Sequence, residues 1–477
     1  MPTPDRSRAV SLEAALDLIE RTAFPDTSAS EPSRKLGLEP ERFVIRVGPD
    51  GLPAGRLPLF GEGGVIETLD ANQPRSKVMR PRDPQRVPPF VELDNGGSLT
   101  FEPGAQIEHS TAVHTTANEA LADVRTVVCE LATLFRERSV ALLSVGLDPF
   151  DEPESVPQQL EHGRYHAMAA YLAKIGPSGA AMMRGSTSLQ VNVDLGSGQT
   201  REDRYRLANL LSPSLVASFS TSPERPGTER FHCRRARVWQ TLDPSRTGFP
   251  ESFSDPQAPT ASRAYAGAML DADVLLFLGS DPKGADAAIG TPGFRFRDWL
   301  RDGHPEHGFP TTDDLAYHLT TVFPEVRARG FLELRAIDGL PDCWRAGAVA
   351  FVAGLLYDDR AMGLALELLE PWRQDLQARW WSSAERGFED PELAEVTQKL
   401  WSVALDGAER LGEDYLAREE LDQAIAYRER FPERRRAPAD ELRETLARCR
   451  GEGLLFASDP AQECGSSASL TGPAGRA

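Results

Sequence analysis

The chain has 477 residues, 40% of them hydrophobic, which is enough for a large core in one big domain or two smaller ones. Its formal net charge of −19 argues against nucleic acid as a partner, because binding to phosphate backbones needs clustered cations. The sequence has no apolar run of ~18 residues to span a membrane, and its first residues lack the apolar core of a signal peptide. We therefore expect a cytoplasmic protein without a membrane partner.

The cysteines and the common nucleotide motifs are uninformative about function. The five cysteines are scattered and form no CxxC pair, so neither a disulfide framework nor a cysteine zinc site is indicated, and we expect structural thiols at positions 129, 233, 343, 449 and 464. The sequence also lacks P-loop, GxGxxG, HExxH and GxSxG patterns. A nucleotide, if one is used, must be bound by another design.

Strand patterns recur in the first two thirds of the chain. They predict strands at residues 35–47, 141–147, 188–194 and 331–336. Residues 48–92 are rich in glycine, proline and charge and predict hairpins and loops.

Helical patterns lie between and beyond these strands, at residues 11–22, 116–135 and 201–219. Thr116 and Glu119 form a capping box at the start of the second helix, and Pro213 predicts a kink or interruption in the third. From about Ala346 to Cys449 the pattern is almost entirely helical.

These elements predict the α+β class, an antiparallel sheet with helices packed behind it and a helical C-terminal part. We predict one domain over residues 1–457, rich in sheet at 35–340 and helical at 341–450. The final segment, 458–477, is small and polar and predicts a disordered tail.

Several predicted strands carry acids on one whole face. Glu39 and Glu41 share a face in "GLEPERFVI", Glu102 and Glu108 share one in "SLTFEPGAQIEHS", and Glu333 faces the same way as Arg335 in "FLELRAID". Any one of these faces, taken alone, is typical of a solvated sheet surface. Together they favour a divalent cation site, and ligands that are all oxygen indicate magnesium or manganese rather than zinc. Such a site suits phosphoryl transfer.

The same segments, in the same order, resemble the second type of the glutamate–cysteine ligase family, found in plants and bacteria. The resemblance covers roughly residues 35–360 and rests on six motifs: "GLEPERF", "FEPGAQIE", "GRYHAMAAYL", "MMRGSTSLQVNVD", "RRARVWQTLDPSRTG" and "HLTTVFPEVRARGFLELRAIDGLP". Each motif alone is a weak signal, and six in register are a strong one.

The resemblance implies a glutamine-synthetase-like fold, with a funnel-shaped antiparallel sheet whose outer face is covered by helices. It also implies ATP-dependent ligation of the glutamate γ-carboxylate to the amine of L-cysteine through a γ-glutamyl phosphate, with ATP as co-substrate and Mg²⁺, or Mn²⁺, as cofactor. The products are γ-glutamylcysteine, ADP and phosphate. The expected partners are these small molecules, and the expected assembly is a monomer or homodimer.

The resemblance assigns roles residue by residue. Magnesium would be bound by Glu39, Glu41, Glu102, Glu108 and Glu333. Arg335 would neutralise the transferring γ-phosphate. Glutamate would be bound by Arg235, Arg246, Thr247, Trp239 and Arg184, and the nucleotide side would involve Arg164, Tyr165 and Gln190. A surface role for Arg235, a core role for Trp239 and a plain salt bridge for Arg335 are the alternatives.

The amine acceptor is the part of the function that the motifs leave open. After Glu108 the plant enzymes have S-G-A-P, whereas this chain has "HSTAV". The segment around "MMRGST" instead resembles the bacterial branch that opens ergothioneine biosynthesis, which catalyses the same ligation. Two alternatives follow: a γ-glutamyl ligase for another amino acid or amine, and a non-catalytic relative that binds glutamate or a nucleotide.

Overall fold

The computed structural model describes residues 9–25, 33–224, 230–250, 253 and 260–448. Its main sheet has nine strands, all antiparallel to their neighbours, along the path β12-β13-β7-β1-β5-β4-β3, with β2 and β6 both paired to β1. The strands of this sheet are β1 (Leu36–Val47), β2 (Pro53–Arg56), β3 (Val91–Glu92), β4 (Ser98–Phe101), β5 (Ile107–Ser110), β6 (Val140–Leu143), β7 (Leu189–Asp194), β12 (Val326–Ala328) and β13 (Phe331–Leu334).

Two small sheets lie outside the main one. In one, β8 (Thr247–Gly248) and β11 (Phe323–Pro324) run parallel, and in the other, β9 (Leu276–Phe277) and β10 (Ala288–Ile289) run antiparallel. The parallel pair brings the chain after residue 247 next to the chain that leads into β12.

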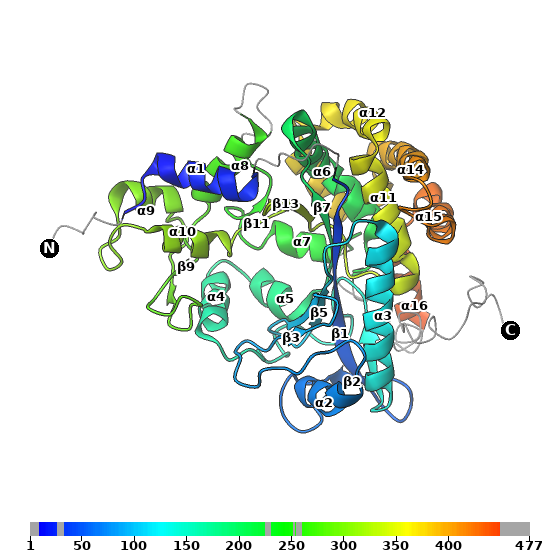
Figure 1. Ribbon diagram of the computed structural model, residues 1–477, viewed down its shortest axis with the longest axis horizontal. Helices are drawn as coiled ribbons and strands as arrows, with labels where there is room; N and C mark the ends of the chain where they lie inside the picture. The colour runs from blue at the N-terminus through cyan, green and yellow to red at the C-terminus, as the bar shows by residue number, and fades with distance from the viewer. Residues whose placement is uncertain (1–8, 26–32, 225–229, 251–252, 254–259, 449–477) are drawn as a thin grey trace.

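Helices surround the main sheet, and Figure 1 shows α3 and α11 running alongside β1, with the later helices beyond them. The first half contains α1 (Leu12–Ala23), α2 (Val65–Asn72), α3 (Ala117–Arg136), α4 (Gly163–Ala173), α5 (Ser178–Gly185), α6 (Gly198–Phe219) and α7 (Arg234–Gln240). The second half contains α8 (Ala261–Asp271), α9 (Phe296–Asp302), α10 (Thr312–Leu319), α11 (Arg345–Tyr357), α12 (Asp359–Leu369), α13 (Leu376–Glu385), α14 (Pro391–Leu411), α15 (Arg418–Arg430) and α16 (Pro438–Arg448).

The two faces of the sheet have different chemistry because strand side chains alternate. Leu38, Val191 and Leu332 point into the large apolar core, which also contains every apolar side chain of α11. The alternate positions, such as Gln190 and Glu333, form the opposite, polar face. The predicted α+β class, the antiparallel sheet and the helical C-terminal part are therefore confirmed.

Three local predictions were wrong. The stretch 48–92 contains the helix α2, whose buried Val65 and Leu69 lie four residues apart. Pro213 does not interrupt α6, which continues through it. Cys233 and Cys343 carry thiols as expected, but Cys129 is disulfide-bonded.

Two further expectations concern the ends of the chain and the membrane. The predicted tail at 458–477 lies outside the described residues. Among the helices that the structure describes, none is both long and apolar enough to cross a bilayer.

Candidate active site

The strand register gathers the predicted acids on the polar face of the sheet. Glu41 of β1 lies opposite Glu108 of β5, and Glu39 lies opposite Gln190 of β7. Ser188 donates both its backbone N–H and its hydroxyl to the carboxylate of Glu41, at 2.9 and 2.8 Å. Side chains directly opposite one another across strands are ~5 Å apart at Cβ, so these acids form one cluster.

Glu102 reaches the same cluster from the tip of the β4–β5 hairpin. Its backbone N–H donates to the carbonyl of Gln106 at 3.0 Å, which closes a tight turn that includes Ala105 in the left-handed region at φ 65°. A side chain at Gly104 would place its Cβ 2.4 Å from the carbonyl oxygen of Arg184, so only glycine fits there. The turn is thereby held against the end of α5.

Glu333 on β13 belongs to a charged network rather than to a bare acidic pair. Arg327 of β12 lies directly opposite and donates to both carboxylate oxygens of Glu333, at 2.9 to 3.0 Å. Arg335 also pairs with Glu333 and donates to the amide oxygen of Gln190 at 3.1 Å. On the other side, Asn192 of β7 lies opposite Glu333 and donates to Glu39 at 2.9 Å.

The charge of the other acids is poorly compensated by protein groups. Burial, and then the charges of Glu108 and Glu333, raise the pKa of Glu39 to about 8. Burial and the charge of Glu41 raise the pKa of Glu108 to about 7. Burial also raises the pKa of Glu41 and of Glu102, where Glu108 adds to the effect. Buried carboxylates of this kind favour a positively charged ligand.

Glu333 is the exception within the cluster. Burial alone would raise the pKa of its carboxyl, but Arg335 and Arg327 outweigh this effect and lower that pKa to about 2. Glu333 therefore stays ionised without any added cation, and in this arrangement its partners are guanidinium groups.

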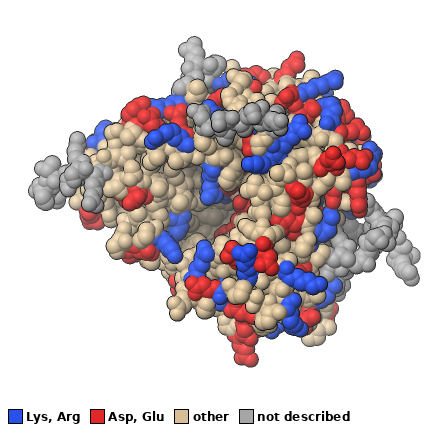
Figure 2. Space-filling view, viewed as in Figure 1, with Lys and Arg blue, Asp and Glu red and all other residues tan. Residues whose placement is uncertain are grey.

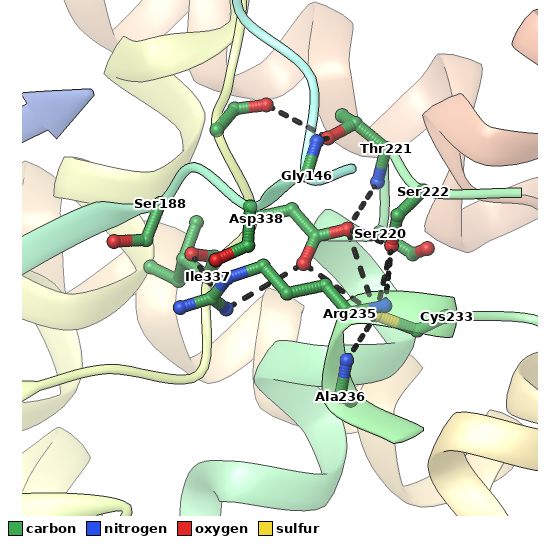
Figure 3. A network of polar contacts seen from close by, with 12 residues as sticks. Gly146, Ser188, Ser220, Thr221, Ser222, Cys233, Arg235, Ala236, Ile337 and Asp338 are labelled. Carbon is green, nitrogen blue, oxygen red and sulfur yellow. Dashed lines mark hydrogen bonds and ion pairs between the residues drawn. The ribbon is translucent and has the colours of Figure 1, made fainter. Parts of the chain in front are cut away.

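Arg235 is held at the edge of the polar face by a buried network around Asp338 (Figure 3). The carboxylate of Asp338 accepts from the backbone of Thr221 at 2.9 Å and from the hydroxyl of Ser222 at 2.6 Å, and it pairs with Arg235 at 3.6 Å. Arg235 also donates to the carbonyl of Arg335 at 3.2 Å. The network thus fixes the start of α7 relative to the end of β13.

Comparison with known proteins identifies the family to which these residues belong. Residues 64–464 match the family model described as glutamate-cysteine ligase family 2.

The chain belongs to glutamate-cysteine ligase family 2.

Named relatives of this family 2 ligase cover most of its length. Glutamate–cysteine ligase EgtA of Mycolicibacterium smegmatis is 34% identical over 412 residues, covering 85% of this chain and 91% of that protein. The chloroplastic glutamate–cysteine ligase of Medicago truncatula is 31% identical over 429 residues, covering 86% and 79%. A solved glutamate–cysteine ligase of Francisella tularensis, in complex with AMP, aligns over 92% of this chain and 90% of that one, with 12% identity and a TM-score of 0.47.

Two predicted residues of the family 2 ligase lie next to the acidic cluster. Trp239 of α7 places its ring 5.1 Å from the Arg335 guanidinium carbon and packs edge-on against Phe323 at 5.7 Å. Tyr165 of α4 is mostly buried, and burial together with the charge of Glu102 raises its pKa to about 12.

Four other predicted residues hydrogen-bond to backbone groups elsewhere. Arg164 donates to the carbonyl of Thr320, and Arg184 donates to that of Val156. Thr247 donates its hydroxyl to the carbonyl of Asp243. The contacts of Arg246 are an ion pair with Asp243 at 2.6 Å and hydrogen bonds to the carbonyls of Thr321 and Asp273. Arg246 is 2% exposed, and this geometry favours an indirect role, through support of the loop that carries Thr247.

Three polar residues near the acids of the ligase were not predicted from the sequence. Arg327 and Glu325 both belong to "FPEVR", and the β12–β13 hairpin puts Arg327 opposite Glu333. A search for a strand partner of Glu333 could have found Arg327. Glu325 and Asp338 gave no such signal, because their neighbours come from the β8–β11 pair and from α7, far away in sequence.

The oxygen atoms of the acidic cluster are suitable ligands for a metal ion. Figure 2 shows a hollow in this face of the molecule, bordered by both acidic and basic side chains. Within the described parts of the chain, no three histidine, cysteine, aspartate or glutamate side chains are grouped closely enough to hold an ion as they stand. The donors are nevertheless of the right kind, since the pKa values of Glu39 and Glu108 are raised and the buried amide oxygen of Asn192 has no partner among the described residues.

Proposed function

We propose that the protein joins the γ-carboxylate of glutamate to the amine of L-cysteine at the expense of ATP. The observation that carries this proposal is the gathering of five acids, Gln190 and Arg335 on one face of the sheet in a chain of this family. Phosphoryl transfer needs little covalent chemistry from a protein, but it does need positioning and neutralisation of charge, which these residues offer.

Magnesium, or manganese in its place, would be held by Glu39, Glu41, Glu102 and Glu108. Their raised pKa values support this assignment, because they report negative charge that lacks a cation. Bound there, the ion would neutralise the phosphate oxygens of ATP. Glu333 is a weaker ligand in this proposal, since Arg327 and Arg335 already engage its carboxylate.

The reaction would proceed in two steps. The γ-carboxylate oxygen of glutamate attacks the terminal phosphorus of ATP, forming γ-glutamyl phosphate and releasing ADP. The cysteine amine then attacks the acyl carbon, the C–N bond forms, the C–O bond to phosphate breaks, and the ammonium protons pass to solvent. Arg335 would stabilise the charge on the transferring group, while Arg235 and Trp239 would bind the glutamate.

The remaining predicted residues have less direct roles in this proposal. Tyr165 and Arg164 of α4 would line the nucleotide side, and Gln190 would orient Arg335 through their hydrogen bond. Arg184 and Thr247 would bind substrate only after side-chain movement, since both now bond to backbone carbonyls.

A panel of amines tests the acceptor. Purified protein is given glutamate, ATP and Mg²⁺ with L-cysteine, alanine, 2-aminobutyrate or other amines, and both ADP release and product mass are measured. We expect cysteine to give the highest kcat/KM and a product with the mass of γ-glutamylcysteine. Turnover of cysteine no better than that of alanine or 2-aminobutyrate would reassign the acceptor, and no glutamate-dependent ADP with any amine would remove the proposal.

A further inference from the structure

A small cavity next to the acidic cluster contains a carboxylate that the proposed reaction has not used. Its walls include Arg235, Trp239, Phe323, Arg335 and the side chain of Glu325. Glu325 is 6% exposed. The space is about 10 Å³, close to what one water-sized group occupies.

The position of Glu325 is set by the backbone on both sides. Its N–H donates to the carbonyl of Gly248 in β8, and its own carbonyl accepts from the N–H of Arg335 at 3.2 Å. These two hydrogen bonds hold the backbone at Glu325 between the β8–β11 pair and the end of β13. Glu325 sits at a fixed point between two parts of the site.

Two residues that line this cavity carry donors without partners. Within the described residues, the buried indole nitrogen of Trp239 and the Nε of Arg235 make no hydrogen bond. Buried donors without acceptors are costly and uncommon, so an acceptor group of the substrate is expected to lie beside them when the substrate binds. A carboxylate beside Trp239 and Arg235 would satisfy both.

The residues around the cavity therefore combine donors for a carboxylate with one acid for a cation, and the space itself fits one group of the size of an ammonium. An α-amino acid head group carries both charges on adjacent atoms. The ammonium group is about the size of a water molecule, and the buried Glu325 carboxylate and the aromatic rings of Trp239 and Phe323 suit it, beside the two arginines.

We propose that Glu325 binds the α-ammonium group of glutamate while the γ-carboxylate of the same molecule is activated. This inference rests on the proposed function. It assigns the cavity to the amino-acid end of glutamate, with Arg335 at the boundary between the cavity and the acidic cluster. Burial raises the pKa of Glu325 to about 7, although Arg235, Arg335 and the side chain of Trp380 act in the opposite direction.

The test compares glutamate with glutarate, which has both carboxylates but no ammonium group. ADP release is measured with saturating ATP, Mg²⁺ and L-cysteine for the wild type, Glu325→Gln and the control Glu92→Gln, which changes an exposed side chain of β3. We expect the wild type and the control to prefer glutamate by at least about 30-fold in kcat/KM, because glutarate leaves a buried acid without its partner. In Glu325→Gln the preference should fall to within about threefold, mainly through loss of activity with glutamate.

The other outcomes are distinguishable. Equal losses with both substrates would make Glu325 a structural residue, and a raised KM for cysteine with an unchanged glutamate preference would place it at the acceptor; either result overturns the inference. If Glu325→Gln does not fold, the wild type and Glu325→Asp provide the test. Equal kcat/KM of the wild type for glutamate and glutarate would overturn the inference. The 30-fold preference of the wild type, together with a reduced preference in Glu325→Asp, would support it. Absence of glutamate-dependent ADP in the wild type would instead contradict the proposed function.

Discussion

At the scale of single residues, the acids of the polar face differ in what compensates their charge. Glu333 has two guanidinium partners and a lowered pKa, whereas Glu39 and Glu108 have mostly other acids around them and raised pKa values. This difference follows from register, since Arg327 lies opposite Glu333 while Glu108 lies opposite Glu41. Glu333 thus forms ion pairs within the protein, whereas Glu39 and Glu108 belong to a group of acids that needs an added cation.

This distribution predicts how stability depends on pH and magnesium. The pKa of Glu39 is about 8 in the folded protein against 4.5 when unperturbed, so the folded state binds more protons between these values. The free energy of unfolding of the metal-free protein should therefore fall as pH rises from about 4.5 to 8. Mg²⁺ needs ionised ligands and should raise the melting temperature by about 5 °C at pH 8 and by less at pH 6.

Melting curves with EDTA and with several millimolar Mg²⁺, at both pH values, measure this effect. Calcium-free potassium chloride at matched ionic strength is the control for general screening. A magnesium shift that is absent, or larger at pH 6 than at pH 8, would be inconsistent with these acids as the ion site.

Replacing one acid tests the cluster by activity. Glu41→Gln keeps the shape of a side chain that accepts hydrogen bonds from Ser188 but removes its charge. We expect kcat to fall by about 100-fold or more, because the charge acts where phosphate is transferred. The control Glu92→Gln removes an exposed acid and should retain wild-type kcat. Steady-state ADP release makes the comparison, and equal activity of the two variants would remove Glu41 from the site.

At the scale of elements, the alternation of polar and apolar side chains along each strand was predictable from sequence. The pairing between segments distant in sequence was not. The polar faces of β1, β7 and β13 followed from side chains at every second position, which is a local property. The parallel contact of β8 with β11 joins residues 247 and 323, and no local pattern in either segment indicates it. For the same reason Glu41 and Glu333 were identifiable, and Glu325 was not.

In the β4–β5 hairpin, position 104 has no room for a side chain. Gly104→Ala would place Cβ 2.4 Å from the carbonyl of Arg184, so the turn or α5 must shift. We expect a loss of about 1–3 kcal/mol in the free energy of unfolding, and reduced kcat because Glu102 lies in the same turn. In the matched control Gly176→Ala, the added Cβ has no neighbour within 4 Å, and the change should stay within about 0.5 kcal/mol. Urea unfolding distinguishes the two, and a neutral Gly104→Ala would contradict this packing.

The Asp338 network predicts a strong coupling between α7 and the end of β13. Asp338→Ala leaves Arg235 buried without its ion-pair partner and should cost about 3–5 kcal/mol. Glu395→Ala, which removes an acid from an exposed pair with Lys399, should change stability by less than about 1 kcal/mol. Chemical unfolding of both variants provides the test. Similar small losses would mean that Asp338 does not hold α7 in place.

At the scale of the whole molecule, the main sheet carries the residues proposed for the reaction. Its apolar face packs on α11 and the core, which keeps the strands in register, and its polar face presents the acids. The family and the reaction type were predictable because six motifs lie along the strands and turns of this sheet. The amine acceptor was not predictable, because residues 109–113 depart from the plant pattern. In the structure, His109 points away from the acids and toward Asp123, with 3.7 Å between its Nε2 and the Asp123 carboxylate.

The central claim is that ATP activates the γ-carboxylate of glutamate as an acyl phosphate on this polar face. The direct measurement uses glutamate labelled with ¹⁸O in the γ-carboxylate, with ATP, Mg²⁺ and L-cysteine, and determines by mass spectrometry where the label goes. The account predicts one ¹⁸O atom in each phosphate released and ADP as the nucleotide product. Unlabelled phosphate, or label in AMP, would contradict it.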